Sequence, residues 1–168
     1  MPFYHKRNRI PALLLVFCIC AVMLTGCGEL TGEQQAGSYS YTMTYNADEV
    51  YFKDGEIYEY FQCKDTIDTE VGQGIRVTRY ESEYDFSIII QAINDTTERG
   101  FKVDKVMVGK KAYPAYMVRF SFAGADGNMY TECDYQVSYN GNSLLITAIY
   151  DVEHSDVISD IIATLELK

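Results

Sequence analysis

The sequence predicts an α+β fold, in which an antiparallel sheet of about six strands is covered by two helices in an α/β/α sandwich. Short stretches of alternating apolar and polar residues are separated by turn signals, as is typical of strands joined in hairpins. Two other stretches repeat apolar residues every three or four positions, as amphipathic helices do. Because helices and sheets bury their apolar faces against one another, we expect both helices to cover the sheet.

Four strands are predicted before the first helix. The strand over residues 38–45 alternates strictly, and its apolar face consists of Tyr39, Tyr41, Met43 and Tyr45. Residues 50–53 and 56–61 flank Asp54-Gly55, a dipeptide that favours a tight hairpin turn. A polar loop over residues 65–74 then leads to a strand at residues 75–80.

The first helix is predicted between Ser82, with Asp85 three residues later as a variant of the capping box, and Gly100. Its apolar stripe is Phe86, Ile89, Ile90, Ile93 and Thr97. The second helix closes the chain, with Ser155 as the expected cap. Its apolar stripe is Val157, Ile158, Ile161, Ile162 and Leu165.

Three strands are predicted between the helices as a meander over residues 112–122, 129–139 and 144–150. On the first, we expect Tyr116, Val118, Phe120 and Phe122 to face the core. On the second, the expected apolar face is Met129, Cys133, Tyr135, Val137 and Tyr139. The third is apolar at nearly every position, which indicates a central strand covered on both faces.

This order of elements resembles the PsbP-like fold. The stretches that carry the resemblance are YTMTYNADEVYF near the start of the domain, SIIIQAI in the first helix, the meander from VGKKAYPAYMVRF to LLITAIYD, and the closing HSDVISDIIATLEL. The fold is shared by extrinsic proteins of photosystem II, a Ran-binding nuclear import factor (Mog) and many small bacterial lipoproteins. The resemblance implies a domain that binds or assembles with other proteins.

The N-terminus resembles a lipoprotein signal peptide. A basic leader precedes an apolar run over residues 10–24, which is shorter than the roughly 20 residues that span a bilayer. The run ends in Leu24-Thr25-Gly26-Cys27, which resembles the bacterial lipobox, in which small residues precede a cysteine whose thiol takes the diacylglyceryl group. We predict a signal peptide over residues 1–26 and lipidation at Cys27. The alternatives are an ordinary signal peptide and an uncleaved anchor.

Cleavage before Cys27 leaves an acidic extracytoplasmic chain. The leader contains Lys6, Arg7, Arg9 and no acidic residue, so its removal changes the net charge from −10 to −13. Such a charge disfavours binding to nucleic acid or to anionic lipid headgroups, so the lipid itself would anchor the protein to the membrane. We expect residues 27–37 to be a flexible tether with a reach of roughly 17–19 Å, and residues 38–168 to form a single domain.

The mature sequence offers no catalytic constellation. His154 is its only histidine, and at the start of a helix we expect it to be a solvated boundary residue. A serine or cysteine hydrolase needs a base beside its nucleophile, and a zinc site needs three or four clustered ligands. Asp65, Asp68 and Glu70 share one loop that could hold Ca²⁺, but a solvated acidic loop is the expected state. We therefore predict no enzyme, metal or cofactor.

Cys63 and Cys133 are the thiols of the predicted domain, and both fall in strands. Outside the membrane they could form a disulfide, and the alternative is two buried free thiols that act as small apolar side chains. Sequence alone does not decide between them.

Tyrosine is the most unusual feature of the composition, with 15 residues, all but Tyr4 in the mature chain. Tyrosine forms strands readily and is also enriched at binding surfaces. We expect a contact surface at Tyr58, Tyr60, Tyr113 and Met117. The leading hypothesis is a non-enzymatic, lipid-anchored module that binds an envelope protein or a secreted ligand. The alternatives are a carrier of small molecules or lipids, with a pocket between helix and sheet, and an unrecognised hydrolase.

Overall fold

A computed structural model of the chain describes residues 31–80 and 103–168. The described part contains ten strands, one α-helix and one short 3₁₀ helix. The first strands are β1 (Glu33–Gly37), β2 (Tyr41–Asn46), β3 (Val50–Asp54), β4 (Tyr58–Cys63) and β5 (Gly74–Tyr80), with η1 (Lys64–Thr66) after β4. The others are β6 (Val103–Val108), β7 (Tyr113–Ala123), β8 (Met129–Tyr139), β9 (Asn142–Tyr150) and β10 (Glu166–Leu167), with α3 (Ser155–Ala163) before β10. The predicted helix over residues 82–100 lies outside the described residues.

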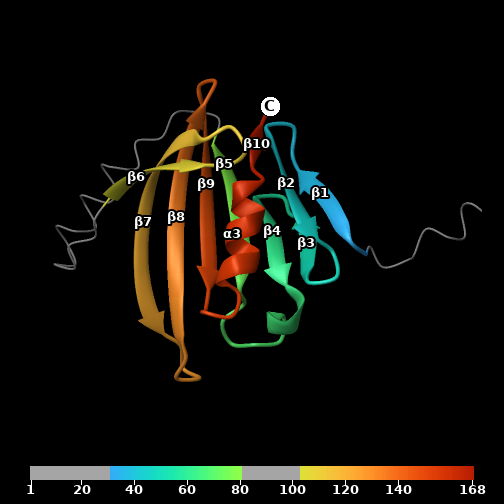
Figure 1. Ribbon diagram of the computed structural model, residues 1–168, viewed down its shortest axis with the longest axis vertical. Helices are drawn as coiled ribbons and strands as arrows, with labels where there is room; N and C mark the ends of the chain where they lie inside the picture. Colours follow the sequence, from blue (N-terminus) through green and yellow to red (C-terminus); the bar gives the residue numbers. More distant parts are fainter. Residues whose placement is uncertain (1–30, 81–102) are drawn as a thin grey trace, which may run out of the picture. The chain divides into compact units, whose positions relative to one another are not determined.

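Seven strands form the larger sheet, in the order β3-β4-β5-β9-β8-β7-β6, and every neighbouring pair is antiparallel (Figure 1). The β7–β8–β9 meander confirms the three strands predicted there. A hairpin joins β3 to β4 as predicted, but the prediction of a two-residue turn at Asp54-Gly55 is wrong, because Asp54 ends β3 and pairs with Glu59, and residues 55–57 connect the two strands. Strand β9 lies inside the sheet between β5 and β8, so the prediction of a central strand from its apolar sequence is confirmed. One lateral row of paired residues runs Phe61, Ile75, Ala148, Cys133.

A second sheet contains three strands in the order β1-β2-β10, where the sequence predicted one sheet of about six strands. The alternation of β2 was interpreted correctly, because Tyr41, Met43 and Tyr45 are all buried. Tyr39 precedes the strand and is exposed, contrary to expectation. The prediction of a tether through Gly37 is also wrong, since residues 33–37 form β1 and pair with β2. Hydrogen bonding between backbones, which leaves no apolar pattern, holds this polar segment in the sheet.

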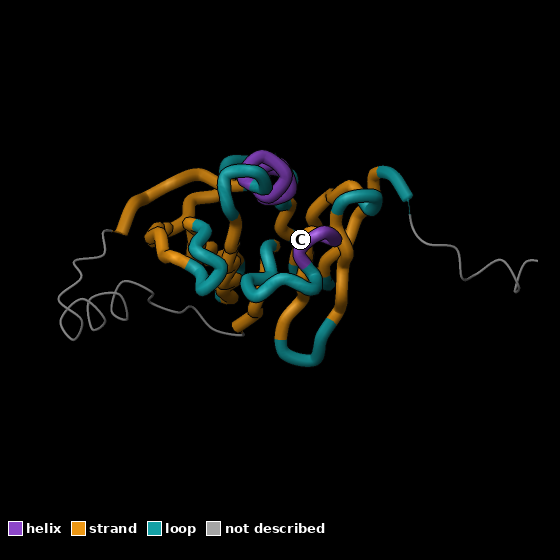
Figure 2. Tube along the Cα trace, turned by 90° about the horizontal axis from the view of Figure 1, so that it is seen from below, coloured by secondary structure: helices purple, strands orange, loops and turns teal. Residues whose placement is uncertain are grey.

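Helix α3 and the three-stranded sheet cover one face of the seven-stranded sheet, which we call the inner face (Figures 1 and 2). Ile158, Ile161 and Ile162 of α3 are buried in this core, as the helical stripe predicted. The expected cap is wrong by one residue: His154 is the N-cap, and the Ser155 hydroxyl instead donates to the Val152 carbonyl.

The opposite, outer face carries a second and smaller apolar cluster. Val118 is buried there against Val103, Phe120 and Leu145. The predicted core residues of β7 therefore lie on the outer face, while Ala115, on the alternate face of the strand, joins the main core. The error arose because both faces of β7 carry apolar side chains. Alternation assigns residues to two faces but does not say which one is inner.

Within residues 31–80 and 103–168, no helix is both long enough and apolar enough to cross a membrane.

Candidate functional site

The clearest exposed aromatic cluster lies on the β3–β4 hairpin. Tyr58 and Tyr60 both project from the outer face of β4, with ring centroids 6.4 Å apart and ring planes at 80°. The Arg76 guanidinium carbon lies 5.8 Å from the centroid of the Tyr58 ring. Tyr51 on β3 is 50% exposed, Ile57 in the turn 75% and Tyr58 44%. We call Tyr51, Ile57, Tyr58 and Tyr60 the hairpin patch.

A hollow of about 580 Å³ accompanies this patch, and Ile57, Tyr58 and Tyr60 line it together. The register explains the grouping: Lys53 pairs with Tyr60, and Tyr51 pairs with Gln62, so these side chains share the outer face. Strand pairing on both sides of β4 fixes the backbone beneath Tyr58 and Tyr60. Ile57, Tyr58 and Tyr60 of the patch therefore border a hollow, and the two tyrosines stand on a rigid support.

The other two residues of the expected contact surface lie elsewhere. Tyr113 and Met117 are on the inner face of β7, on the opposite side of the sheet from Tyr58 and Tyr60. Tyr113 packs against the main core, and its hydroxyl accepts a hydrogen bond of 3.1 Å from the Leu167 amide. The four residues therefore do not form one surface, and Tyr113 stabilises the attachment of β10.

Cys63 and Cys133 are both buried free thiols. Cys63 lies on β4, two residues after Phe61, and Cys133 lies on β8. Strands β5 and β9 lie between β4 and β8, so three strand spacings, roughly 14 Å, separate the two cysteines. A disulfide requires Cα atoms within about 7 Å, so the two cysteines do not pair in this fold. The Cys133 sulfur instead lies 3.4 Å from the Tyr150 hydroxyl.

His154 is held between two carboxylates, and the expectation of a solvated histidine is wrong. Its Nδ1 lies 2.8 Å from Asp151 Oδ1, and its Nε2 lies 3.1 Å from the Asp65 carboxylate. Gln73 continues the network: its side-chain amide donates to Asp151 Oδ2, and its side-chain oxygen accepts from the Asp151 amide. We call Asp65, Gln73, Asp151 and His154 the histidine clamp. It joins η1, the start of β5 and the start of α3.

The pKa values agree with this geometry. Burial lowers the pKa of His154, but its hydrogen bonds with Asp151 and Asp65 raise it more, so the net change is upward. The pKa of Asp151 is lowered, because hydrogen bonds from His154 and Gln73 outweigh the effect of burial. Both shifts favour the charged forms, a protonated His154 beside an ionised Asp151.

The clamp lacks the features of a nucleophilic site. Cys63 and His154 line the same hollow of about 400 Å³, but burial and the negative charges of Asp65 and Asp151 raise the pKa of the Cys63 thiol to about 11. A thiol with this pKa is protonated at neutral pH and is a poor nucleophile. Both ring nitrogens of His154 already have carboxylate partners. The arrangement can hold three elements together, and it does not present a base to a nucleophile.

The acidic loop does not gather its carboxylates into a cation site. All three side chains are exposed, and of these the Asp65 carboxylate contacts His154. In the two described ranges, no three histidine, cysteine or acidic side chains converge closely enough to hold a metal ion.

A buried ion pair lies where the two sheets meet. Arg79 Nη2 on β5 lies 3.1 Å from Glu59 Oε1 on β4, and the Glu59 side chain is fully buried. Burial raises the pKa of Glu59, and the charge of Arg79 opposes that rise. Burial raises the pKa of the Tyr41 hydroxyl, and the negative charge of Glu59 raises it further. These three residues form a polar centre in an otherwise apolar core.

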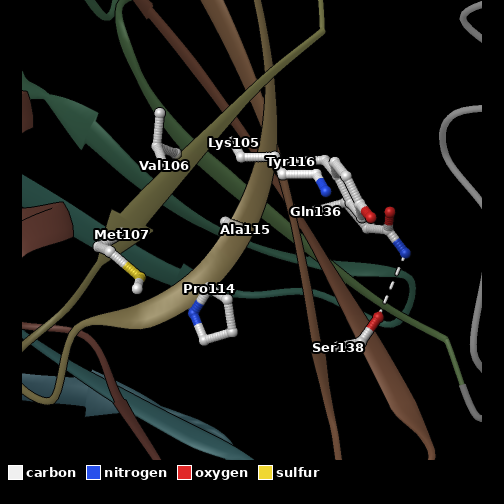
Figure 3. Close-up of a pocket in the computed structure, with 8 residues that line it drawn as sticks. All are labelled: Lys105, Val106, Met107, Pro114, Ala115, Tyr116, Gln136 and Ser138. Carbon is white, nitrogen blue, oxygen red and sulfur yellow. Dashed lines mark hydrogen bonds between the residues drawn. The ribbon is translucent and has the colours of Figure 1, made fainter.

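An apolar pocket lies among β6, β7 and β8, away from α3 (Figure 3). The carrier hypothesis expected a pocket between helix and sheet, but the two hollows beside α3 have several acidic side chains on their walls. Lys105 and Met107 of this pocket were not singled out from the sequence, because β6 was not predicted. The valines at positions 103, 106 and 108, between two glycines, were the signal that indicated a strand.

Comparison with known proteins establishes the fold. Neither a family model nor a curated protein matches the sequence. The solution structure of cyanobacterial PsbP (CyanoP) from Synechocystis aligns over 85% of this chain and 96% of that chain, with a TM-score of 0.53 and 10% identity. The fold is PsbP-like.

Two further solved structures align with this PsbP-like fold. A crystal structure from Bacteroides thetaiotaomicron matches 82% of this chain, with a TM-score of 0.55 and 16% identity. It covers 48% of that protein, so the present chain spans about half of its length. The crystal structure of LpqN, involved in cell envelope biogenesis of Mycobacterium tuberculosis, has a TM-score of 0.49 and 12% identity, over 81% of this chain and 90% of LpqN.

Proposed function

We propose that this protein is a non-enzymatic, lipid-anchored extracytoplasmic binding or assembly module, and that the hairpin patch contacts a protein partner in the cell envelope. The observation that carries the proposal is the clustering of Tyr51, Ile57, Tyr58 and Tyr60 on one side of a rigid hairpin. Tyrosine combines a large apolar ring with a polar tip, and it often dominates the energy of an interface.

The support beneath the patch favours binding without a large loss of conformational entropy. Tyr58 and Tyr60 stand on a strand that is paired on both sides, so their backbone is already ordered before a partner binds. Arg76 adds a cation beside the Tyr58 ring. An aromatic pair next to an arginine is the composition expected at the centre of a protein interface.

The geometry of the histidine clamp supports the proposal that the module is non-enzymatic. His154 has a carboxylate at each ring nitrogen, and Cys63 keeps its proton at neutral pH. The lipid anchor rests on the sequence from Leu24 to Cys27, and the acidity of the mature chain leaves the lipid as the means of attachment.

Site-specific photocrosslinking tests the contact surface. Benzoylphenylalanine replaces Tyr58 in the full-length chain, which is expressed in its own host and irradiated in intact cells. The matched control carries the same group at Met129, which is 61% exposed on the β7–β8 hairpin. We expect a discrete covalent adduct with one protein from position 58 and none from position 129.

The second part of the experiment substitutes two other residues of the patch. A chain with Ile57→Ser and Tyr60→Ala, but with the photoreactive group still at position 58, should lose most of the adduct while its circular dichroism spectrum is unchanged. Equal adducts from positions 58 and 129, or an adduct that survives both substitutions, would place the contact surface elsewhere.

A further inference from the structure

The apolar pocket among β6, β7 and β8 has a volume of about 440 Å³, within the range typical of small-molecule sites. Lys105 pairs with Tyr116 across β6 and β7, and Tyr116 pairs with Gln136 across β7 and β8. Their side chains therefore share the outer face, and Figure 3 shows them directed to the same side. Met107 and Pro114 lie at the other end of the pocket (Figure 3).

The pocket separates an apolar end from a polar end. Met107, which is 68% exposed, forms the apolar end with Pro114. At the polar end, the Lys105 ammonium lies 5.7 Å from the centroid of the Tyr116 ring, and the Gln136 side-chain amide lies 3.4 Å from the Ser138 hydroxyl. Gln136 is buried, so a polar group stands at the base of an otherwise apolar wall.

Charge decides which kind of ligand fits. Among the residues that the structure describes, Lys105 is the only charged side chain that lines the pocket, and the whole chain has a net charge of −10. A cationic ligand would meet this lysine at close range, whereas an anionic head group would pair with it. Gln136 lies in the same row of paired residues as Lys105 and Tyr116, and its side-chain amide can donate to an oxygen atom.

We infer that this pocket binds a small carboxylate with an apolar body. The carboxylate pairs with the Lys105 ammonium beside the Gln136 amide, while the apolar body packs on Tyr116, Pro114 and Met107. The site lies on the same face as the hairpin patch, but four strands separate β6 from β4. Binding at this pocket therefore does not depend on a protein partner at the patch.

Photoaffinity labelling of the full-length chain in lipid nanodiscs tests the assignment. The probe is an aryl-diazirine derivative of 4-phenylbutyrate, and the labelled residues are mapped by peptide mass spectrometry. We expect saturable labelling within residues 105–116 and 136–138, blocked by excess 4-phenylbutyrate. The neutral 4-phenylbutan-1-ol, which keeps the apolar body and lacks the charge, should compete about fivefold less well, as an exposed ion pair allows.

Two lysine variants complete the test. Lys105→Gln should weaken the apparent affinity of the probe about fivefold. Lys110→Gln, which changes an exposed lysine in the next turn, should leave it unchanged. Circular dichroism checks that both variants are folded. Labelling that does not saturate, or that is equal for Lys105→Gln and the parent chain, would overturn the assignment, as would equal competition by the alcohol. The adduct at position 58 is a separate readout, so either proposal can fail alone.

Discussion

The Nε2 atom of His154 lies 3.1 Å from the carboxylate of Asp65, although 89 positions separate the two residues in the chain. The contact joins the segment after β4 to the start of the only α-helix in the described residues. Asp151 binds the other ring nitrogen. Protonation of this one imidazole is therefore coupled to the contact between the segment after β4 and the start of α3.

We predict that the histidine clamp makes stability depend on pH. Because the pKa of His154 is raised by folding, its contribution is fully present below the unfolded pKa of about 6.5 and is lost as the pH rises through the folded pKa. The pKa of Asp151 is lowered, so its contribution is present above about 3.9 and is lost as the pH falls through the folded value.

Urea denaturation measures this effect. The parent chain should exceed His154→Gln in free energy of unfolding by about 1–2 kcal/mol near pH 5.5, where the clamp is charged. The difference should shrink at about pH 9. Asp65→Asn should weaken the same pH dependence. A difference that is identical at both pH values would show that the clamp does not titrate with folding.

The last helix is expected to be essential to the core. Ile161 is 4% exposed, so Ile161→Asp places a charge without a partner among apolar side chains, which costs several kcal/mol. Ile161→Ala should cost about 2–5 kcal/mol through the cavity that it leaves. Asp160→Ala, on the exposed side of α3, is the matched control and should change stability by less than about 0.5 kcal/mol. An unchanged urea midpoint for Ile161→Asp would mean that α3 is not packed on the sheet.

The Glu59–Arg79 pair should be far more sensitive to the loss of one partner than to the loss of both. Arg79→Leu leaves a buried carboxylate without its cation, and we expect a cost of about 3–5 kcal/mol. The double variant Glu59→Leu/Arg79→Leu should recover much of that loss, because no buried charge then remains. A double-mutant cycle in urea measures the coupling free energy. If the double variant were as unstable as Arg79→Leu, packing and not charge would explain the defect.

Both thiols of the folded domain should remain free outside the membrane. In the absence of reductant, alkylation under denaturing conditions should modify Cys63 and Cys133 completely, whereas the folded chain should react slowly, because both are buried. Mass spectrometry counts the modified residues. A species oxidised at both positions in the protein from its own host would contradict the strand order that keeps them apart.

Lipidation is tested at Cys27. We expect Cys27→Ala to accumulate as an unprocessed precursor, because only a thiol accepts the diacylglyceryl group and cleavage follows that step. Labelling of cells with a radioactive fatty acid should mark the parent chain alone. Equal incorporation into both chains would rule out this site of attachment.

Sequence patterns predicted those elements whose two sides differ in polarity. The alternation of β2 and the helical stripe of α3 correspond to buried residues because each element has one apolar side. The patterns failed where backbone pairing alone fixes a segment, as in β1. They also failed on β7, where both faces are apolar and Ala115, the core residue, is the smaller side chain.

The candidate sites were partly predictable for a similar reason. Tyr58 and Tyr60 could be assigned to one side of a strand because residues two apart share a face. The predicted turn at Asp54-Gly55 gave the wrong register, since Asp54 pairs with Glu59. The histidine clamp could not be predicted, since its partner Asp65 approaches His154 only through the order of strands in the sheet. The pocket required β6, in which the adjacent charged residues Asp104 and Lys105 interrupt the apolar alternation by which a strand is found.

Strand β1 also limits how far the domain can operate from its anchor. If the lipid is on Cys27, five peptide units join it to Gly32, immediately before the first strand residue, and a fully extended chain of that length spans at most roughly 18 Å. That distance is about half the thickness of a bilayer with its headgroups. The domain would therefore search for partners in a thin layer above the membrane surface, at a high local concentration for membrane-bound proteins and out of reach of anything held farther away.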